Sequence, residues 1–351
     1  MEAYEIRIAL KSDDKALVQF LDTHWMKDHV FVKSRMLLDW QHYDAKLDRY
    51  NFVIGVEKIS QEIHGILGFI TLSQFAPQTD PRKLCWMAIW KVQEAARGRR
   101  LGRRLMDFLT DTIEPEIIST VAASEMTLGM YKAKGYRVGE MTQHYILNPN
   151  KSDFQLVKTT GTNAASSHSR TDDSGKSLVL ANETDISKNF AACFVAQNCL
   201  PVKSREYFIN RYLRHPVYQY QAYMIRDKSG VVGIVISRVC SHRGAKAIRI
   251  VDYSGPDNAL QGLSDAWKKL LQKSGAEFID FYSAGISHED IEASGFLLRE
   301  RNGDVVIPNY FEPFEQKNVE INYMTSAADD KPFRIVKGDS DQDRPNFIKD
   351  I

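Results

Sequence analysis

The chain has 351 residues, of which 46 are lysine or arginine and 45 are aspartate or glutamate, so its formal net charge is +1. This balance argues against a general binder of nucleic acids or membrane surfaces, which would need a strong basic excess. Hydrophobic residues make up 43% of the chain, which excludes disorder throughout. No apolar run approaches the roughly 18 residues of a membrane span, and the first residues lack a signal peptide's apolar core, so we expect a cytoplasmic protein. The cysteines follow no metal-ligand spacing, which predicts reduced thiols and no metal site: Cys85, Cys193, Cys199 and Cys240.

The first half of the chain alternates between strand-like and helix-like patterns. Apolar runs predict strands at residues 4–9, 51–57, 63–73, 84–92, 117–122 and 143–147. Apolar residues at helical spacing predict helices at residues 15–25, 33–41, 101–112 and 125–134. Ser12 or Asp13 would cap the first helix, and Gly135 would end the last. This order predicts an α/β (α+β) fold, with helices on both faces of one sheet.

The most informative segment joins the strand at 84–92 to the helix at 101–112. It reads Trp90-Lys-Val-Gln-Glu-Ala-Ala-Arg97-Gly-Arg-Arg-Leu-Gly102. A glycine-containing turn before a helix suits a pyrophosphate, because free N–H groups and the positive end of the helix dipole point into the turn. Five arginines add cationic side chains that could reach phosphate oxygens: Arg97, Arg99, Arg100, Arg103 and Arg104.

This segment resembles the pyrophosphate loop of the GNAT (Gcn5-related N-acetyltransferase) superfamily, whose pattern is Arg/Gln-x-x-Gly-x-Gly/Ala. Arg97, Gly98 and Gly102 match the pattern, whereas Arg100 stands at the first motif glycine. The resemblance implies a mixed, mostly antiparallel sheet and acetyl-CoA as co-substrate. It implies that the main chain of a splayed strand and the loop hold the coenzyme, through Trp90, Val92, Arg97, Gly98, Arg99, Arg100, Leu101 and Gly102.

A second segment follows in the order that the family shows. Ser124-Glu-Met-Thr-Leu-Gly-Met-Tyr131-Lys-Ala-Lys-Gly135-Tyr136 resembles the family's later helix and closing turn, with Ser124 in place of the usual asparagine. The resemblance implies that Tyr131 protonates the departing CoA thiolate. The alternative is that the arginines form only a solvated basic helix face and that Tyr131 packs in the core.

GNAT chemistry is direct attack of an amine on the acetyl thioester, so the acceptor's ammonium must first lose a proton. A carboxylate, a histidine or a water chain can take that proton. Our first catalytic candidate besides Tyr131 is Glu94. The sequence does not decide among the full set of candidate bases: Glu94, His42, Asp39, His29 and His24.

The segment from His24 to Tyr43 is dense in histidine, tryptophan and charge. It resembles GNAT-like proteins associated with bacterial surface-polysaccharide synthesis, which implies an amino sugar as acceptor, with a nucleotide-linked form as one option. A helix–helix interface would suit the same residues equally. The predicted substrate-binding residues are His29, Lys33, Asp39, Trp40 and His42.

The second half repeats the pattern of the first. Val32-Lys-Ser-Arg35 recurs as Val202-Lys-Ser-Arg205, at an offset of 202 − 32 = 170 residues, and both copies run into strand patterns. We predict strands at 218–225, 231–239, 247–253 and 278–282, and helices at 258–272 and 288–292. The duplication predicts an N-terminal GNAT domain at 1–157, a linker or mobile loop at 158–177 and a GNAT-like domain at 178–351.

Two losses predict that the second copy is degenerate. Its loop position reads Val251-Asp-Tyr-Ser-Gly-Pro-Asp257, without the arginine and the second glycine. Ile291 stands at the tyrosine position, four residues before Gly295. We therefore expect this copy to keep the fold and to lack a CoA site.

The C-terminal tail carries alternating aspartates at 339, 341 and 343, with Asp350 at the twelfth position of an EF-hand-like pattern. Arg344 stands where a calcium loop needs glycine, which argues against calcium. We expect salt bridges and turn hydrogen bonds to pin the tail instead, through Asp341, Asp343, Arg344 and Asn346.

The favoured function is transfer of an acyl group, acetyl in the first instance, from CoA to the amine of a small polar acceptor in surface-polysaccharide synthesis. A non-catalytic binding or scaffold protein stays open as an alternative. So does an aminoacyl-tRNA-dependent transferase, although the near-zero charge argues against an RNA surface. The expected partner is the small-molecule acceptor, without nucleic acid or membrane, and a homodimer is one option for the assembly.

Overall fold

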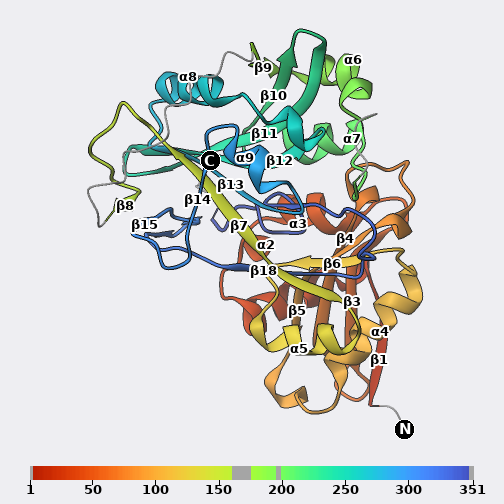
Figure 1. Cartoon of the computed structure of the whole chain (residues 1–351). Coiled ribbons are helices and arrows are strands. Elements are labelled where there is room, and N and C mark those ends of the chain that lie inside the picture. Colours follow the sequence, from red (N-terminus) through yellow and green to blue (C-terminus); the bar gives the residue numbers. More distant parts are fainter. Residues whose placement is uncertain (1–2, 160–174, 195–198, 348–351) are drawn as a thin grey trace. The chain divides into compact units, whose positions relative to one another are not determined.

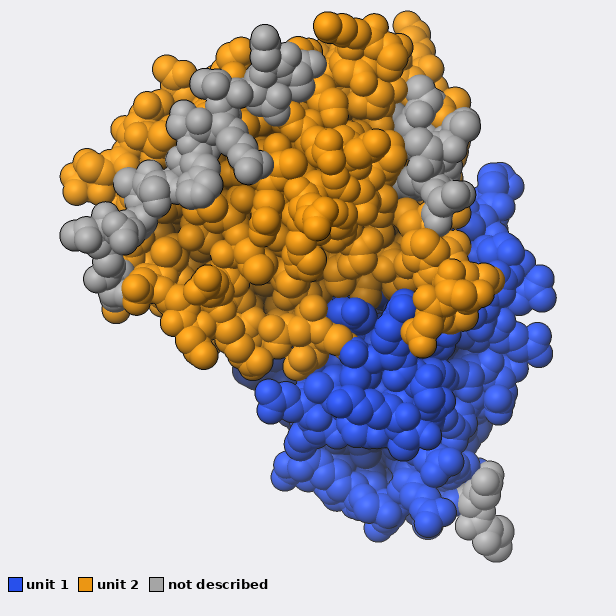
Figure 2. Space-filling view, in the orientation of Figure 1, with its two compact units in different colours: residues 1–138, 323–327, 344–351 blue, residues 139–322, 328–343 orange. Residues whose placement is uncertain are grey.

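The computed structural model describes residues 3–159, 175–194 and 199–347, apart from the side chains of 192–194. Cys193, Asp350 and most of the predicted linker at 158–177 therefore lie outside the described residues. The chain forms two compact units (Figure 2), with residues 1–138, 323–327 and 344–351 in unit 1 and residues 139–322 and 328–343 in unit 2. This division differs from the predicted boundaries at 157 and 178, because each unit contains a strand from the other half of the sequence. Among the described residues, no helix is long and apolar enough to cross a membrane.

Unit 1 is built on a mixed sheet in the order β1-β3-β4-β5-β6-β18, with β2 beside β3 (Figure 1). Among the strand pairs of its described residues, β5 and β6 alone pair in parallel. The strands are β1 (Tyr4–Leu10), β2 (Tyr43–Asp44), β3 (Arg49–Glu57), β4 (Ile63–Thr71), β5 (Cys85–Val92), β6 (Ile118–Val121) and β18 (Ile321–Thr325). The middle strands β3 and β4 are nearly continuous apolar runs because helices cover both of their faces.

The helices of unit 1 begin and end at residues whose types explain the boundaries. They are α1 (Asp14–Phe20), α2 (Val30–Lys33), α3 (Arg35–His42), α4 (Leu101–Ile113) and α5 (Glu125–Ala133). The predicted helix at 15–25 divides into α1 and a wider π-helical turn that ends at Trp25. Gly135 follows α5 with a φ of 78°, as predicted, and the N–H of Tyr136 closes the turn by donating to the carbonyl of Tyr131 at 3.0 Å.

Two glycines bring α4 close to the sheet. A Cβ added at Gly55 would lie 2.8 Å from Leu101, and one added at Gly65 would lie 3.1 Å from both Leu101 and Leu105. The missing side chains therefore let the first turns of α4 sit directly on β3 and β4. This contact fixes the position of the helix whose first residues form the predicted phosphate loop.

Unit 2 has its own sheet, in the order β7-β13-β12-β11-β10-β9, with β14 beside β7 and β19 beside β13 (Figure 1). Its strands are β7 (Arg137–Leu147, which starts in unit 1), β9 (Ser177–Ala181), β10 (Tyr220–Asp227), β11 (Gly230–His242), β12 (Ala245–Ser254), β13 (Phe278–Ala284), β14 (Leu297–Leu298) and β19 (Ile335–Val336). Its helices are α6 (Glu183–Phe194), α7 (Arg205–Phe208), α8 (Ser264–Ser274) and α9 (His288–Glu292). Two short strand pairs complete it, β8 (Lys158–Thr159) with β15 (Val305–Val306) and β16 (Tyr310–Phe311) with β17 (Phe314–Glu315).

The repeated sequence Val-Lys-Ser-Arg has the same structural role in both halves. The hydroxyl of Ser34 caps α3 by accepting from the N–H of Leu37 at 3.2 Å, and the hydroxyl of Ser204 caps α7 by accepting from Tyr207 at 3.2 Å. Strands and helices then follow in a similar order in the two halves, up to β6, α5 and β7 in the first and β13, α9 and β18 in the second, where four short strands, β14 to β17, are inserted between α9 and β18. The structure thus agrees with the duplicated pattern read from the sequence.

The last strand of each half joins the other unit. In unit 2, β7 pairs antiparallel with β13, from Phe278–Leu147 to Ser283–Thr142. In unit 1, β18 pairs antiparallel with β6, where Tyr323 faces Val121. The expectation that the strand at 143–147 closes the first half is therefore wrong.

Candidate functional site

The parallel strands β5 and β6 of unit 1 separate along their length. Their recorded pairs run from Cys85–Ile118 to Met87–Thr120, whereas β5 continues for five more residues to Val92. The side-chain hydroxyl of Thr120 donates to the carbonyl of Met87 at 3.0 Å, at the point of separation. There β5 also bulges against β4, with three residue steps from Met87 to Trp90 opposite two on β4. The two strands therefore open into a V beyond Met87.

The peptide groups of β5 that face this opening follow from its pairing with β4. The N–H of Gln93 donates to His64 on β4 at 3.0 Å. Successive residues of a strand direct their N–H and C=O groups to opposite sides, so the groups of Val92 and Trp90 point away from β4 and into the V. The two residues named from the family resemblance thus present backbone donors and acceptors to the opening.

Two residues of the loop after β5 have positive φ angles, which glycine adopts most easily. Gly98 has a φ of 80°, and Arg100, directly before α4, has a φ of 58° and a ψ of 15°. A non-glycine residue in this left-handed region costs roughly 1–2 kcal/mol. Arg100 therefore adopts a left-handed conformation that glycine would adopt without this cost.

The loop is exposed and cationic. Arg97 pairs with Glu94 at 3.2 Å, and Arg103 lies 3.6 Å from Asp107, whereas Arg99 pairs with no carboxylate in the described part of the chain. A Cβ added at Gly102 would meet only ordinary contacts, 3.5 Å from Trp90 and from Val92. The packing of the protein itself therefore does not require glycine at 102.

Tyr131 on α5 lies beside the outer part of β5. Its ring centroid is 6.5 Å from that of Trp90. Tyr131 belongs to the buried apolar cluster that includes Ala96 and Leu101 at the two ends of the loop, and Trp90 packs against this cluster. Burial raises the pKa of Tyr131 to about 12, so the hydroxyl keeps its proton at neutral pH. The structure brings together the predicted strand, loop and tyrosine.

Two of the predicted acceptor residues are buried histidines. His29 caps α2, where its Nδ1 accepts from the N–H of Phe31 at 3.2 Å, and its Nε2 has no hydrogen-bond partner. Burial, with the nearby charge of Arg344, lowers the pKa of His29 to about 3. His42, at the end of α3, has its Nδ1 3.2 Å from the carbonyl of Phe69, which pairs with Met87 at the start of the bulge.

The remaining predicted residues are more exposed. Lys33 forms an exposed ion pair with Asp28 at 2.6 Å. Asp39 accepts from Arg35 at 2.9 Å and from the hydroxyl of Tyr50 at 2.5 Å. Trp40 packs against Phe75 with ring centroids 4.9 Å apart. The Glu94 carboxylate is 82% exposed and pairs with Arg97 on the loop. Glu94 therefore belongs to the exposed loop surface and not to the buried end of α3.

Arg344, one of the residues expected to pin the tail, lies against the predicted acceptor segment at residues 24–43. This tail residue belongs to unit 1, where its guanidinium lies 5.5 Å from the ring centroid of Phe31. The sequence signalled only that the tail is charged, because Phe31 and Arg344 are more than 300 residues apart.

In unit 2 the corresponding V, between β12 and β13, contains the protein's own tail. Strand β19 pairs with β13, where Val336 faces Ser283, and the N–H of Gly338 donates to the carbonyl of Val251 on β12 at 2.7 Å. The tail therefore crosses from one arm of the V to the other. It uses a backbone acceptor of β12 that corresponds to those of β5 in unit 1.

The loop after β12 also has the wrong polarity for a phosphate. The ammonium of Lys176 donates to the carbonyls of Asn258, Ala259 and Gln261 at 3.0, 3.2 and 2.8 Å. This loop presents acceptors to a cation, whereas a phosphate needs donors. With buried Ile291 at the tyrosine position, the structure supports the expectation that the second copy lacks a CoA site.

The tail aspartates are held by protein donors. Asp343 accepts from Arg238 at 2.8 Å and from the hydroxyl of Tyr220 at 2.7 Å, and Asp339 pairs with Lys203 at 2.8 Å. Arg344 donates to Asn346 at 3.2 Å. These contacts agree with the prediction that ion pairs and turn bonds pin the tail. No group of His, Cys, Asp or Glu side chains within the described ranges is arranged to hold a metal ion.

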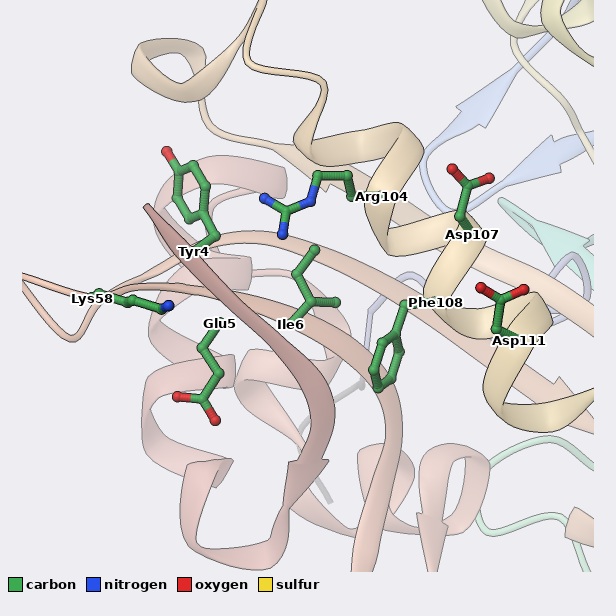
Figure 3. Close-up of a pocket in the computed structure, with 8 residues that line it drawn as sticks. All are labelled: Tyr4, Glu5, Ile6, Lys58, Arg104, Asp107, Phe108 and Asp111. Carbon is green, nitrogen blue, oxygen red and sulfur yellow. The ribbon is translucent and has the colours of Figure 1, made fainter. Parts of the chain in front are cut away.

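A separate hollow of about 470 Å³ lies on unit 1 between β1 and α4. Figure 3 shows Arg104 and Phe108 of α4 facing Tyr4 and Ile6 of β1. Both basic and acidic side chains line this hollow. Neither Tyr131 nor the bulge residues of β5 are among the residues that line it. The residues that line it are Tyr4, Glu5, Ile6, Lys58, Arg104, Asp107, Phe108 and Asp111.

The fold matches solved structures of GCN5-related N-acetyltransferases. One from Anabaena variabilis superposes with a TM-score of 0.56 at 14% sequence identity, over 92% of this chain and 72% of that one. One from Kribbella flavida superposes with a TM-score of 0.55 at 13% identity, over 92% of this chain and 71% of that one. No protein-family model and no curated protein matches the sequence. The chain therefore has the GNAT fold over about nine tenths of its length.

Proposed function

We propose that the chain is an acyl-CoA-dependent N-acyltransferase, with acetyl-CoA as its co-substrate and one active site, in unit 1. The observation that carries the proposal is the V between β5 and β6, where the outward peptide groups of Trp90 and Val92 meet the loop before α4 and the ring of Tyr131. The outward groups would bind the pantetheine amides, and the N-terminus of α4 with Arg99 would bind the pyrophosphate.

The acceptor's uncharged amine attacks the thioester carbonyl carbon, so that a C–N bond forms and negative charge develops on the oxygen. Backbone N–H groups that face the V stabilise this charge. The C–S bond then breaks, and the hydroxyl of Tyr131 gives its proton to the departing thiolate. The proton released from the attacking nitrogen passes to a base and from there to solvent. Solvent in turn returns a proton to the Tyr131 oxygen.

We favour His42 over Glu94 as the first acceptor of that proton. His42 lies against Phe69, whose β5 partner Met87 begins the bulge, whereas the carboxylate of Glu94 pairs with Arg97 on the exposed loop. If Nδ1 of His42 donates to the carbonyl of Phe69, the lone pair on its Nε2 accepts from the side-chain amide of Gln41, 3.2 Å away, and this bond would have to open before Nε2 takes the proton.

We further propose an amino sugar as the acceptor, as the resemblance of residues 24–43 implies. Trp40 offers a half-buried aromatic face and Asp39 a partly exposed carboxylate on the same helix, a combination suited to a sugar ring and its hydroxyls. The unpartnered Nε2 of His29 would donate to an acceptor oxygen.

Calorimetric titration with acetyl-CoA tests the site. We expect binding by the native chain and a loss of affinity of tenfold or more in Gly102→Glu, because the new carboxylate would stand at the first turn of α4. Gly129→Glu is a matched control on α5, since Gly129 is exposed and an added Cβ meets no atom within 4 Å. Equal binding by all three proteins, or none by the native chain, would overturn the proposal.

Turnover separates an enzyme from a CoA-binding scaffold. With amino sugars as acceptors, we expect Tyr131→Phe to keep its affinity for acetyl-CoA while thiol release slows by roughly 10²-fold or more. Undiminished turnover in that variant would remove Tyr131 from the reaction.

A further inference from the structure

Lys337 of unit 2 is held in place by the backbone on both sides of it. Val336 pairs with Ser283 on β13, and the N–H of Gly338 bonds to Val251 on β12. A Cβ at Gly338 would overlap the hydroxyl oxygen of Tyr212, so this part of the tail has little room to shift. The side chain of Lys337 therefore starts from a fixed point within the V of unit 2.

Among the described residues, no hydrogen bond or ion pair joins the ammonium of Lys337 to another group. The residue is 3% exposed, and the one contact recorded for its ammonium is with the ring of Tyr282, 5.6 Å from the centroid. No carboxylate lies within 4 Å of it in the part of the chain that the structure describes. A buried ammonium without an acceptor is costly and therefore rare in folded proteins.

The carboxylates that face Lys337 are already engaged. Asp280 on β13 accepts two hydrogen bonds from Arg249 on β12, at 3.1 and 2.8 Å. Asp343 in the tail accepts from Arg238 on β11 at 2.9 and 2.8 Å. The two arginines and the two carboxylates that act electrostatically on Lys337 balance each other, so the ammonium of Lys337 is the unbalanced charge.

Arg299 supplies another buried donor in the same region of unit 2. Its Nε donates to Gln143 and its Nη2 to Glu320, both at 2.7 Å, whereas its buried Nη1 has no acceptor. The positive charges of Arg299 and Arg249 both act on the hydroxyl of Tyr282. The ammonium of Lys337 lies over the ring of this same tyrosine. Two unsatisfied cationic donors are therefore associated with one tyrosine.

We propose that Lys337 anchors an oxyanion-binding site in unit 2, which takes a carboxylate or phosphate group of a ligand. The anion would accept from the ammonium and neutralise the charge of Lys337, which the Arg238–Asp343 and Arg249–Asp280 pairs leave unbalanced. This site is separate from the CoA site of unit 1 and does not depend on the proposed transferase activity.

The protonation of Lys337 supports this proposal. Burial, together with the charges of Arg249 and Arg238, lowers the pKa of Lys337 to about 7, although Asp343 and Asp280 act in the opposite direction. Without an anion the amine is thus largely uncharged above neutral pH. A bound anion would restore the ammonium, so binding should take up a proton.

Thermal unfolding of the full-length chain tests the site with acetate and with inorganic phosphate, at constant ionic strength against chloride. We expect a saturable rise in Tm with at least one of the two anions, and its loss in Lys337→Met. Lys331→Met is the matched control, because Lys331 is exposed on the same tail. Saturation by phosphate alone would identify a phosphate group, and saturation by acetate would identify a carboxylate.

Proton uptake by the wild-type chain keeps the test independent of any variant's folding. Calorimetry at pH 8 in two buffers of different ionisation enthalpy should show uptake of close to one proton per anion bound. The absence of saturable stabilisation by either anion, equal stabilisation of Lys337→Met, or binding without proton uptake would overturn the proposal.

Discussion

Replacing Lys337 by methionine should stabilise the protein by an amount that depends on pH. The ordinary pKa of lysine is 10.5, and that of Lys337 in the folded chain is about 7. One pKa unit corresponds to about 1.36 kcal/mol, so the buried amine destabilises the folded state by about 5 kcal/mol where both states can be protonated, below pH 7. Methionine has a similar shape and no charge, and so removes this cost.

The sign of the pH dependence follows from which state holds the proton. Between pH 7 and 10.5 the unfolded chain keeps a proton that folded Lys337 has lost, so the stability of the wild-type chain rises with pH in this window. The advantage of Lys337→Met should therefore fall from about 5 kcal/mol near pH 6 to about 2 kcal/mol at pH 9. Other titrating groups are common to both proteins and cancel in the difference.

Urea denaturation of the two proteins at pH 6, 7, 8 and 9 measures this difference. Chloride buffers of bis-tris propane avoid carboxylates and phosphates, which would stabilise the wild-type chain through Lys337. Urea is preferable to guanidinium because it leaves the ionic strength unchanged. A difference that is the same at every pH, or a methionine variant that is the less stable protein, would refute the reasoning about Lys337.

Three further outcomes follow from single contacts. Arg100→Gly should be neutral or stabilising by up to about 1 kcal/mol. Arg100→Val should destabilise by about 1–2 kcal/mol, because a β-branched residue tolerates the left-handed φ least. A glycine variant less stable than wild type in urea would contradict this. Gly338→Val should cost about 2–3 kcal/mol by forcing the tail away from Tyr212, measured as a fall in Tm, and an unchanged Tm would show that the tail gives way freely. His144 is buried and its pKa is lowered to about 3, so the stability of the folded chain should fall as the pH drops from 6.5 towards 3. His144 should cost about 2 kcal/mol of this stability by pH 5. His144→Gln should remove that loss, and unchanged acid sensitivity of the variant would argue against it.

Short-range patterns predicted the elements well because their causes are local. Ser34 and Ser204 cap helices through bonds to residues three positions later, and Gly135 ends α5 within the same turn. The predicted helix at 258–272 begins only at Ser264, because Gly262 has a φ of 77° and the carbonyls of 258, 259 and 261 accept hydrogen bonds from Lys176. The glycine is visible in the local sequence, whereas Lys176 lies more than 80 residues earlier and is not.

The loop and the tyrosine of the candidate site could be located for the same reason, since each is a compact motif. The conformation of Arg100 could not, because a non-glycine residue gives no local sign that it will adopt a left-handed φ. The contacts of the tail were also out of reach. Asp343 and Arg238 stand 105 residues apart, and the sequence shows both charges without showing that they pair.

The exchange of final strands governs the order in which the protein can be completed during synthesis. The edge of β6 that ends at Val121 pairs with Tyr323, which the ribosome adds 323 − 121 = 202 residues later. At roughly 5–20 residues per second, that edge waits on the order of 10–40 s for its partner. For part of this time, until β13 is complete at Ala284, β7 also has no strand to pair with, so β6 and β7 both present open strand edges. A nascent chain cut between the halves would yield two fragments, each lacking the strand that the other half contributes.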